Sequence, residues 1–465
     1  MKRYLLFVVW VCLCGNIWAQ LLQDRIADYV RSSSLLKTSE VGVAVYDLTS
    51  DTLIYGYQDK KLYRPASIEK IITSVTALAQ LGIDYTFATR VAYTGTILAD
   101  STLQGDLYVI GGFDSEFTEQ DMKSFARQIH AAGINKIEGH LVGDVSMMDD
   151  VYWGTGWAWD DTPESFQPYL SPLMLNRGCV NVVVSPSQAK AAPKVTVSPA
   201  SDYYTIENKA VSYCTDAGNL CITRDWLNHS NVITISGNVS KRASKLLNMY
   251  SSKDFFMSTF RFVLQEEGIS VSSFSFGECP SHAQNICLLN RSLIPILERA
   301  LKKSDNLAAE SIFYHLGMIG SDSLHIGFKD AQNAVYRFMN EEIGYDSDNY
   351  KIVDGSGVSM YNYISPDLLL AYLKYIYGRP DLFKVFYNAL PIAGIDGTLS
   401  GRMKKGLACK NVHAKTGTVT GVCSLAGYVK TKKGKMLAFV IINQNILNGK
   451  SARKFQDALC EILAQ

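Results

Sequence analysis

The chain has 465 residues, which is long enough for two or three domains with a large buried core. Its 45 basic and 44 acidic side chains leave a formal net charge of +1, which gives no global electrostatic reason to bind nucleic acid or an anionic membrane. A neutral or small substrate is therefore the first expectation, and no nucleic-acid partner is predicted.

Residues 1–19 have the composition of a secretory signal peptide. Basic residues precede an apolar run, Tyr4–Cys14, which is shorter than the roughly 20 residues that cross a bilayer as a helix, and Ala19 provides a small residue for cleavage. A lipoprotein anchor on Cys14 is the alternative, but Leu13 stands where that signal requires a small side chain. We expect an exported, periplasmic protein with no transmembrane segment in its mature chain.

The first part of the mature chain predicts a hairpin followed by a helix. Between Val41 and Tyr57, two β-rich stretches flank a polar turn. Apolar residues then recur at helical spacing over Ile68–Leu81, and Gly82 follows as a stop signal. This pattern places Ser67 at the start of a helix.

The middle of the chain has a different character, because residues 91–284 consist mostly of short β-rich stretches and turns rich in Gly, Pro, Ser and Asp. At the far end, Ser424–Lys430 and Met436–Asn443 predict two further strands, and 452–463 predicts an amphipathic helix. We therefore expect strands from both ends of the chain to share the sheet of one α/β unit, with the middle inserted into it.

Eight cysteines follow the leader, and none of them forms a C-x-x-C motif. An even number in an exported chain is compatible with disulfides, and the shortest loops would be closed by Cys214 with Cys221 and by Cys279 with Cys287. Isolated buried thiols are the alternative. The seven histidines are scattered and no H-E-x-x-H occurs, so neither a metal nor another cofactor is predicted.

The first pattern with chemical content is Ser67 followed by Lys70. On a helix the two side chains share one face, so a desolvated, neutral lysine there could accept the serine hydroxyl proton near pH 7. The helix amino terminus adds partial positive charge for a developing anion. The string S-x-x-K also occurs at Ser34, Ser187 and Ser451, so taken singly it is equally compatible with a capping serine and a solvated lysine.

The second pattern, Ser304–Asn306, opens the apolar helix predicted over Leu307–Leu316. A hydroxyl and an amide two residues apart can reach into one cleft, where the hydroxyl relays a proton and the amide holds a substrate carbonyl. A helix cap at Ser304 is the alternative. The other S-D-N, Ser347–Asn349, leads into a strand-like stretch and is interpreted as an ordinary turn.

The third pattern, Lys415-Thr416-Gly417-Thr418, contains the only K-T-G of the chain and leads into the last pair of strands. An edge strand here can present an ammonium and a hydroxyl to a substrate carboxylate, while the glycine lets the backbone approach closely. A solvated strand edge is the alternative for this motif taken singly.

The three motifs together are far more specific than any one of them. They occur in the order S-x-x-K, S-D-N, K-T-G, each in the secondary structure its chemistry requires, which is the signature of β-lactamases and penicillin-binding proteins. The chain resembles the D-alanyl-D-alanine carboxypeptidase and endopeptidase family typified by penicillin-binding protein 4, the S13 peptidases. The resemblance covers most of the mature chain and includes four further segments: Gly105–Asp114, Gly156–Asp161, Asp354–Gly357 and Ala393–Leu399.

The resemblance implies an α/β (α+β) fold with a transpeptidase-like domain of the DD-peptidase/β-lactamase type, formed by residues 20–90 and 285–465. The inserted region, 91–284, would form two small β-rich domains. The implied partners are peptidoglycan stem peptides, cleaved at the carbonyl between two terminal D-alanines, and β-lactams, which acylate the same serine.

The resemblance also implies a role for each motif residue. Ser67 would be the acylated nucleophile, Lys70 its base and Ser304 the proton shuttle toward the leaving amine. The backbone amides of Ser67 and Thr418 would form the oxyanion hole. The substrate-binding residues would be Asn306, Lys415, Thr416, Gly417 and Thr418.

Asp161, in the inserted region, aligns with an acidic side chain that in this family reaches the amino group of the substrate's diaminopimelate. Capping of a turn is the alternative for Asp161 and for its neighbour Asp160. The segment Gly112–Ser115 departs from the Gly-Gly-Asp-Pro pattern usual in the family. That departure bears on the local turn and not on catalysis.

Two other interpretations share the motif set. A class A β-lactamase deacylates with a glutamate in an E-x-x-L-N loop, which this chain lacks, and the long interval between Ser67 and Ser304 leaves room for whole domains. A binding or sensor protein that keeps the fold without turnover has the same motifs, and an acylation test would distinguish it from an enzyme.

Overall fold

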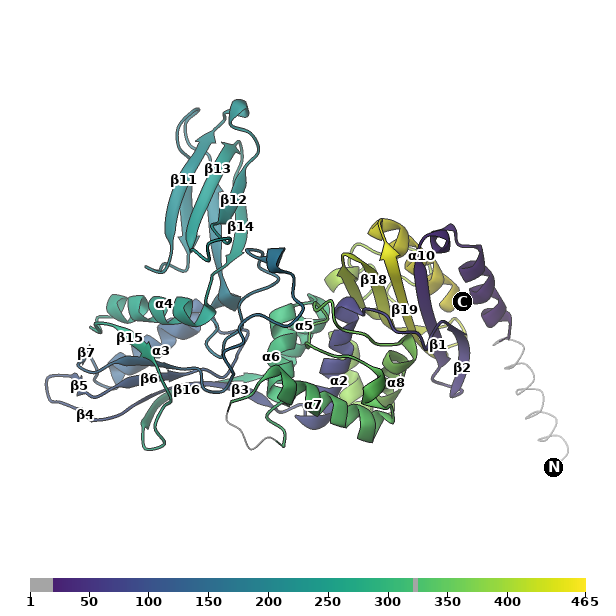
Figure 1. Cartoon of the computed structure of the whole chain (residues 1–465), viewed down its shortest axis with the longest axis horizontal. Helices are drawn as coiled ribbons and strands as arrows, with labels where there is room; N and C mark the ends of the chain where they lie inside the picture. The colour runs from purple at the N-terminus through teal and green to yellow at the C-terminus, as the bar shows by residue number, and fades with distance from the viewer. Residues whose placement is uncertain (1–19, 321–324) are drawn as a thin grey trace. The chain divides into compact units, whose positions relative to one another are not determined.

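The computed structural model describes residues 20–320 and 325–465 (Figure 1), so the predicted leader at 1–19 lies outside the described residues. The chain divides into two compact units. Within the described residues, the first unit comprises 20–83, Leu297–Ile319 and Ala331–Gln465, and the second comprises Asp84–Ile296 and Gly320–Asp330. The predicted domain borders, and the division of the insertion into two domains, stay predictions.

The first unit is built on a five-stranded antiparallel sheet that joins both ends of the chain, as predicted. The last strand pair binds directly to the first one, so that Val43 lies opposite Ile441. In sheet order the strands are β17 (His413–Val419), β18 (Gly421–Lys430), β19 (Met436–Ile446), β1 (Glu40–Asp47) and β2 (Thr52–Tyr57).

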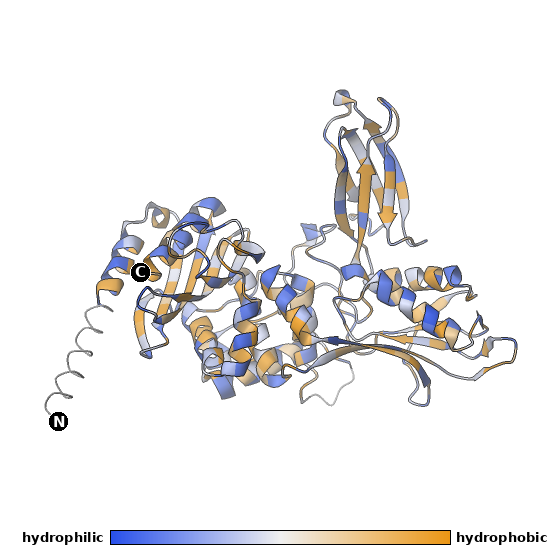
Figure 2. Cartoon of the chain, turned by 180° about the vertical axis from the view of Figure 1, so that it is seen from behind, coloured by the Kyte–Doolittle hydropathy of each residue, from blue (hydrophilic) through white to orange (hydrophobic). Residues whose placement is uncertain are grey.

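Helices cover both faces of this sheet. Its central strands β18 and β19 are accordingly buried along almost their whole length, since their side chains point to both faces. Val43 on β1 belongs to the core that includes Phe455 of α10 (Gly449–Leu463), whereas Gly42 lies against Pro366 of α8 (Pro366–Tyr377). Successive residues of a strand point to opposite faces, so α10 and α8 lie on opposite sides. Figure 2 shows hydrophobic residues along the strands and hydrophilic residues on the outward faces of the helices.

The helix predicted over 68–81 is present, but its start differs in detail. The α-helix α2 spans Lys70–Gln80, and it is preceded by a 3₁₀ turn over Ala66–Glu69 that contains Ser67. α2 packs against α6 (Asn306–Leu316) and α8, which explains why most of its residues are buried. The S-x-x-K motif therefore lies at the centre of the first unit.

The second unit is β-rich, as predicted, with the five-stranded sheet β15-β8-β6-β3-β16 and smaller sheets, among them β10-β9-β14 and β11-β13-β12. The prediction was incomplete, because two long helices, α3 (Glu119–Ala131) and α4 (Ser252–Glu266), also belong to this region. A sequence signal for α3 exists, since Thr118 and Asp121 form a reciprocal capping box at its start. The strands of these sheets are β3 (Thr86–Tyr93), β6 (Leu107–Ile110), β8 (Leu141–Asp144), β9 (Cys179–Ser185), β10 (Lys194–Ser198), β11 (Thr205–Ser212), β12 (Cys221–Arg224), β13 (Val232–Val239), β14 (Ala243–Asn248), β15 (Phe274–Phe276) and β16 (Gln284–Ser292).

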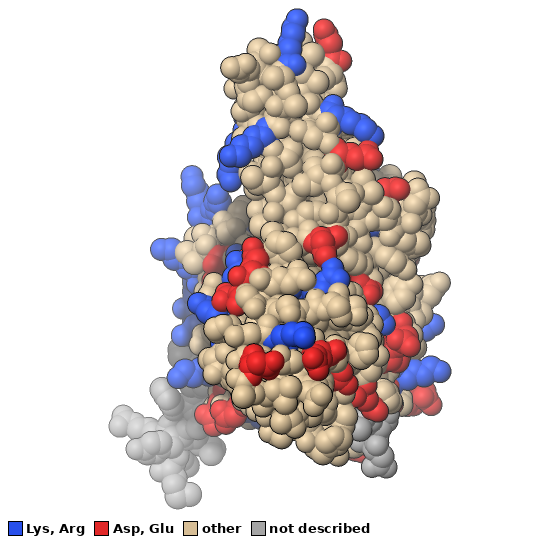
Figure 3. All heavy atoms as spheres, turned by 90° about the vertical axis from the view of Figure 1, so that its left-hand side faces the viewer, with Lys and Arg blue, Asp and Glu red and all other residues tan. Residues whose placement is uncertain are grey.

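Surface charge and thiols give little sign of special chemistry. Basic and acidic side chains are interspersed on the face of the second unit drawn in Figure 3, in agreement with the net charge of +1. None of the eight cysteines of the described residues forms a disulfide, so neither of the two short disulfide loops is formed. Within the described ranges, no helix combines the length and the apolar character needed to cross a membrane.

Candidate active site

Ser67 sits in a turn whose backbone is held in an unusual conformation. The residue before it, Ala66, has φ of 52°, in the left-handed region that side chains other than glycine rarely adopt. A Cβ on Gly357 would lie 2.0 Å from the Ala66 carbonyl oxygen, so only a glycine fits beside this turn. Strain of this kind is typical of functional sites, and Ser67 keeps 8% of its surface exposed to solvent.

Lys70 is fully buried and makes three hydrogen bonds through its Nζ. It donates to Ser67 Oγ at 3.1 Å, to Asn306 Oδ1 at 2.8 Å and to the Ser356 carbonyl oxygen at 2.7 Å. The last two groups can only accept from a lysine, whereas a hydroxyl can also donate. A neutral Lys70 therefore keeps two N–H bonds for Asn306 and Ser356 and directs its lone pair at the Ser67 hydroxyl.

The electrostatic environment brings Lys70 close to the pH range in which it can act as a base. Burial lowers the pKa of Lys70 from 10.5 to about 8. Four nearby carboxyl groups oppose that shift, because negative charge favours the ammonium form: Asp354, Glu310, Asp305 and Glu69.

Two of these carboxyl groups, those of Glu69 and Glu310, are themselves buried. Burial, followed by the charge of Asp354, raises the pKa of Glu310 to about 8 and that of Glu69 well above 4.5. Glu310 Oε2 accepts the Gly355 N–H at 3.1 Å, while neither carboxyl oxygen of Glu69 has a hydrogen-bond partner. Asp354 differs, since it accepts the N–H groups of Gly357, Ser359 and Asn362 at 2.7 to 2.8 Å.

The S-D-N and K-T-G motifs meet through a second buried lysine. Lys415, on β17, donates to Ser304 Oγ at 2.7 Å and to the Thr416 carbonyl oxygen at 2.6 Å. Burial, and then the positive charge of Lys70, hold its pKa well below 10.5. Ser304 has φ of 58° and is not the helix cap, since the Asp305 side chain accepts the Ala308 N–H at 3.0 Å and fills that role.

Gly417 lets strand β17 lie directly beside the serine. A Cβ at this position would be 2.1 Å from Ser424 Oγ, 2.9 Å from the Pro65 carbonyl oxygen and 3.0 Å from the Ser67 backbone nitrogen. On the same strand, the exposed Thr418 follows, and Thr416 Oγ1 lies 2.7 Å from Thr398 Oγ1. The strand thus presents hydroxyl groups next to Ser67.

The structure brings together, in the first unit, eight of the nine residues predicted for the site. The exception is Asp161, which lies in the second unit in the 3₁₀ turn Trp159–Asp161. Burial, and then the charge of Asp160, raise the pKa of Asp161. Its role stays a prediction. The other S-D-N behaves as predicted, because Ser347 lies in a separate 3₁₀ turn.

Sequence reasoning missed three contributors. The Ser356 carbonyl positions Lys70, Thr398 contacts Thr416, and Glu310 places a carboxyl group near Lys70. A signal existed for the first two, since both lie in segments that resemble the S13 family, Asp354–Gly357 and Ala393–Leu399. Glu310 lies one turn after Asn306 on α6 and had no motif of its own.

Comparison with known proteins gives one consistent answer. The D-Ala-D-Ala carboxypeptidase 3 (S13) family model matches residues 22–465. The D-alanyl-D-alanine carboxypeptidase of Actinomadura sp. (strain R39) is 27% identical over 457 residues, which cover 94% of this chain and 84% of that protein. The D-alanyl-D-alanine carboxypeptidase DacB of Haemophilus influenzae is 26% identical over 429 residues, which cover 90% of this chain and 88% of that protein.

A solved structure agrees at the level of the fold. The crystal structure of penicillin binding protein 4 (dacB) from Haemophilus influenzae matches with a TM-score of 0.82 at 24% sequence identity and covers 95% of this chain and 99% of that one. The family match spans all three motifs and sets aside the class A β-lactamase interpretation. The chain belongs to the S13 family of D-Ala-D-Ala carboxypeptidases.

Proposed function

We propose that this protein is a serine-type D-alanyl-D-alanine carboxypeptidase, DD-endopeptidase, or both, which acts on peptidoglycan stem peptides through an acyl-enzyme and binds penicillin covalently. The observation that carries the proposal is the arrangement around Lys70 Nζ. Two obligate acceptors, Asn306 Oδ1 and the Ser356 carbonyl oxygen, leave Ser67 Oγ as the group that faces the amine lone pair.

The first half of the proposed reaction forms the acyl-enzyme. Lys70 takes the Ser67 hydroxyl proton while Oγ attacks the carbonyl carbon between the two D-alanines. The oxyanion is stabilised by the backbone N–H groups of Ser67 and Thr418, a kind of interaction worth about 3 to 4 kcal/mol in the transition state. Ser304, hydrogen bonded to Lys415, passes its proton to the leaving amine as the C–N bond breaks. Ser304 is reprotonated with the proton that Lys70 took from Ser67, so Lys70 is neutral again when the acyl-enzyme has formed.

The second half releases the acyl group. Water gives a proton to Lys70, attacks the ester carbonyl and frees Ser67, which regains its proton from the same lysine. Asn306 would hold the substrate amide carbonyl through its Nδ2, because its Oδ1 is already bonded to Lys70. Lys415, Thr416 and Thr418, with Gly417 allowing close approach, would bind the terminal carboxylate.

Two parts of the proposal concern partners and location. Asp161 would contact the amino group of the substrate's diaminopimelate, and export by the leader would place the enzyme in the periplasm. The proposed binding of β-lactams is supported by a solved complex of Haemophilus influenzae penicillin binding protein 4 with a β-lactam, which matches this fold with a TM-score of 0.77.

Labelling with a fluorescent penicillin tests the proposal. Wild-type protein should become covalently labelled, and Ser67→Ala should abolish the label. Ser34→Ala is the matched control, because Ser34 begins another S-x-x-K string but is exposed in a separate 3₁₀ turn. Absence of label on the wild-type protein would contradict the proposed enzymatic function. The interpretation as a binding or sensor protein would then be favoured. Digestion of purified sacculi, with mass analysis of dimers and monomers, then separates endopeptidase from carboxypeptidase activity.

A further inference from the structure

The second unit contains a pocket with an unusual concentration of aromatic rings, which we term the aromatic cleft. It has a volume of about 310 Å³. Trp159 at its mouth is 67% exposed, and Leu227 is 65% exposed. Exposed apolar groups gathered around a concave site are typical of binding surfaces. The rings that line it belong to Tyr152, Trp153, Trp159, Tyr169, Trp226 and His229.

All four tryptophans of the described residues gather here. Trp159 and Trp226 come from segments far apart in sequence, yet their ring centroids are 5.2 Å apart with 39° between the ring planes. Trp153 is 5.0 Å from Tyr169, and Trp157 packs edge-on against Trp153 at 5.5 Å. The cleft therefore offers several broad, flat faces within one small volume.

A buried arginine fixes the two walls of the cleft against each other. Arg224, on β12 just before Trp226, is only 1% exposed. Its guanidinium donates to Thr162 Oγ1 at 2.9 Å, to the Asn248 carbonyl oxygen at 2.8 Å and to the Ser230 carbonyl oxygen at 3.1 Å. Thr162 follows directly after the turn that carries Trp159. The aromatic faces are thus held in place before any ligand arrives, which lowers the entropic cost of binding.

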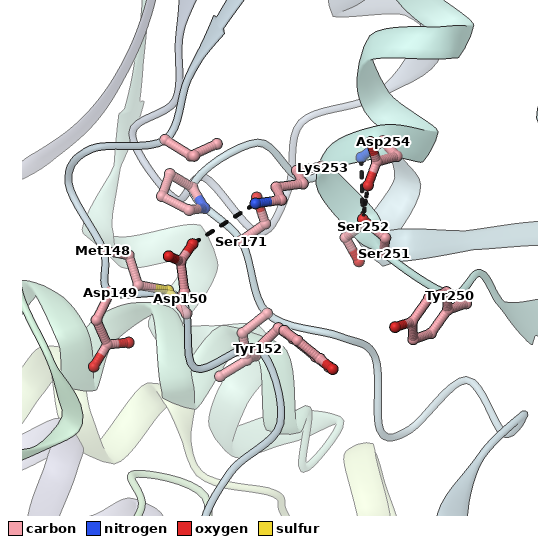
Figure 4. Close-up of a pocket in the computed structure, with 13 residues that line it drawn as sticks. Met148, Asp149, Asp150, Tyr152, Ser171, Tyr250, Ser251, Ser252, Lys253 and Asp254 are labelled. Carbon is pink, nitrogen blue, oxygen red and sulfur yellow. Dashed lines mark hydrogen bonds and ion pairs between the residues drawn. The ribbon is translucent and has the colours of Figure 1, made fainter. Parts of the chain in front are cut away.

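The charge of the lining indicates what kind of ligand would fit. No carboxylate, lysine or arginine is among the described residues that line the aromatic cleft. Tyr152 also lines a neighbouring cavity of about 430 Å³ that is strongly charged, with Asp149, Lys253 and Asp254 in its wall (Figure 4). The contrast between the two sites points to a neutral occupant for the aromatic one, with a flat apolar face and polar edges.

We propose that the aromatic cleft binds the N-acetylated sugar rings of the glycan strands to which stem peptides are attached, a proposal that rests on the proposed function. A pyranose ring presents several C–H groups on one face, and their partial positive charge is attracted to the negative face of an aromatic ring. The ring's hydroxyl and amide groups point outward, where the indole, phenol and imidazole groups of the rim can hydrogen bond to them. A charged peptide would have no counter-charge in this lining.

Intrinsic fluorescence is a direct test, because Trp153, Trp159 and Trp226 line the cleft and Trp157, the other tryptophan of the described residues, packs against Trp153. Purified protein without its leader is titrated with the N-acetylglucosamine tetramer, and the glucose tetramer serves as a control without acetamido groups. The N-acetylated sugar should give a saturable change in fluorescence. No saturable change, equal binding of the glucose tetramer, or binding of lysophosphatidylcholine instead would overturn the proposal.

Variants locate the effect. Trp226→Ala should weaken binding of the tetramer about tenfold or more, corresponding to about 1.4 kcal/mol or more, while Trp226→Tyr keeps a ring face and should retain most of the affinity. Tyr213→Ala, which removes a 53% exposed aromatic outside the cleft, should bind as the wild type does. Unchanged affinity in Trp226→Ala would contradict the site.

Activity separates this proposal from the proposed function. Trp226→Ala should hydrolyse a soluble pentapeptide ending in D-Ala-D-Ala at the wild-type rate but act several-fold more slowly on intact sacculi. An equal loss on both substrates would indicate a folding defect and contradict the glycan role. If the wild type binds the sugar but cleaves no pentapeptide, the proposed function fails and the sugar site stands.

Discussion

The surroundings of the two buried lysines differ in their charged neighbours, and this difference bears on which of the two could act as a base. Lys70 and Lys415 are both fully buried, and burial lowers the pKa of each. Carboxyl groups surround Lys70 and bring its pKa back to about 8, whereas Lys415 faces a hydroxyl, a carbonyl and the charge of Lys70. Burial lowers the pKa of both lysines. The carboxyl groups raise the pKa of Lys70 again, into the range in which a lysine can take up and release a proton near neutral pH.

The same contrast assigns different tasks. A base that takes a proton in one step and returns it in the next works best with a pKa near the operating pH. A lysine whose pKa is lowered by burial and by a neighbouring cation gains instead from a negative charge, because that charge favours its ammonium form. We therefore expect the pKa of Lys415 to rise when the substrate carboxylate binds next to it.

Removal of Lys70 is the most direct test of the different tasks expected of Lys70 and Lys415. Lys70→Ala should slow acylation by fluorescent penicillin about a hundredfold to ten-thousandfold, the usual contribution of a general base, while the protein still folds. Lys37→Ala is the matched control, because Lys37 ends another S-x-x-K string and lies in a 3₁₀ turn away from any site motif. Normal acylation in Lys70→Ala would refute the assigned base.

The substitution Gly417→Ala, which adds a single methyl group, tests whether β17 must approach Ser67 closely. Gly417→Ala puts a Cβ 3.0 Å from the Ser67 nitrogen and 2.1 Å from Ser424 Oγ, so the strand must shift away from the nucleophile. A misplacement of about 1 Å costs on the order of a hundredfold in rate, which stopped-flow acylation would measure.

Gly401→Ala provides the matched control for this change, since a Cβ there meets no atom within 4 Å. It should leave the acylation rate unaltered. Equal rates for Gly417→Ala and wild type would show that the strand does not need to approach Ser67 closely.

The pH dependence of acylation tests the influence of one carboxyl group, that of Glu310, on the pKa of Lys70. Acylation requires neutral Lys70, so its rate should rise with pH through about 8. Glu310→Gln keeps an oxygen for the Gly355 N–H but removes a carboxyl group whose ionised form favours the ammonium form of Lys70. The midpoint of the profile should therefore move to lower pH, by about one unit or less.

Asp305, Glu69 and Asp354 still act on Lys70 in that variant, and Lys415 repels its charge, so the shift is partial. Glu342→Gln, an exposed change elsewhere in the first unit, should leave the profile in place. A midpoint that rises in Glu310→Gln would mean that the carboxyl groups do not support the charge on Lys70.

Sequence reasoning named side chains that the structure brings together, but it did not find the groups that shift their pKa values. Ser67, Lys70 and Lys415 carry short, ordered motifs, and the shared sheet of the two chain ends followed from apolar strand patterns at each end. Glu310 could not be found this way, because its effect on Lys70 depends on burial and on the packing of α6 against α2. Helices α3 and α4 were missed because the turn-rich composition around them dominated the interpretation of residues 91–284.

The smallest expected effect on catalysis, and an informative one for stability, comes from Glu69. Its folded-state pKa lies well above 4.5, so the folded protein keeps a proton that the unfolded chain loses. Folding then takes up a proton, and the free energy of unfolding falls as pH rises above about 4.5, by at most about 1.4 kcal/mol per pH unit for one group. Glu69→Gln removes this contribution, while Glu310, whose pKa is raised to about 8, preserves a similar one.

Denaturant unfolding from about pH 5 to pH 8 should therefore show a shallower decline for Glu69→Gln than for wild type. Glu341→Gln, a change of an exposed carboxyl group, should leave the slope as it is. The acylation rate of Glu69→Gln should stay within a fewfold of wild type, since Glu69 is the last of the four carboxyl groups in its effect on Lys70. A steeper decline of the free energy of unfolding in Glu69→Gln would mean that Glu69 is ionised in the folded protein. Lys70 would then have one more negative charge close to it.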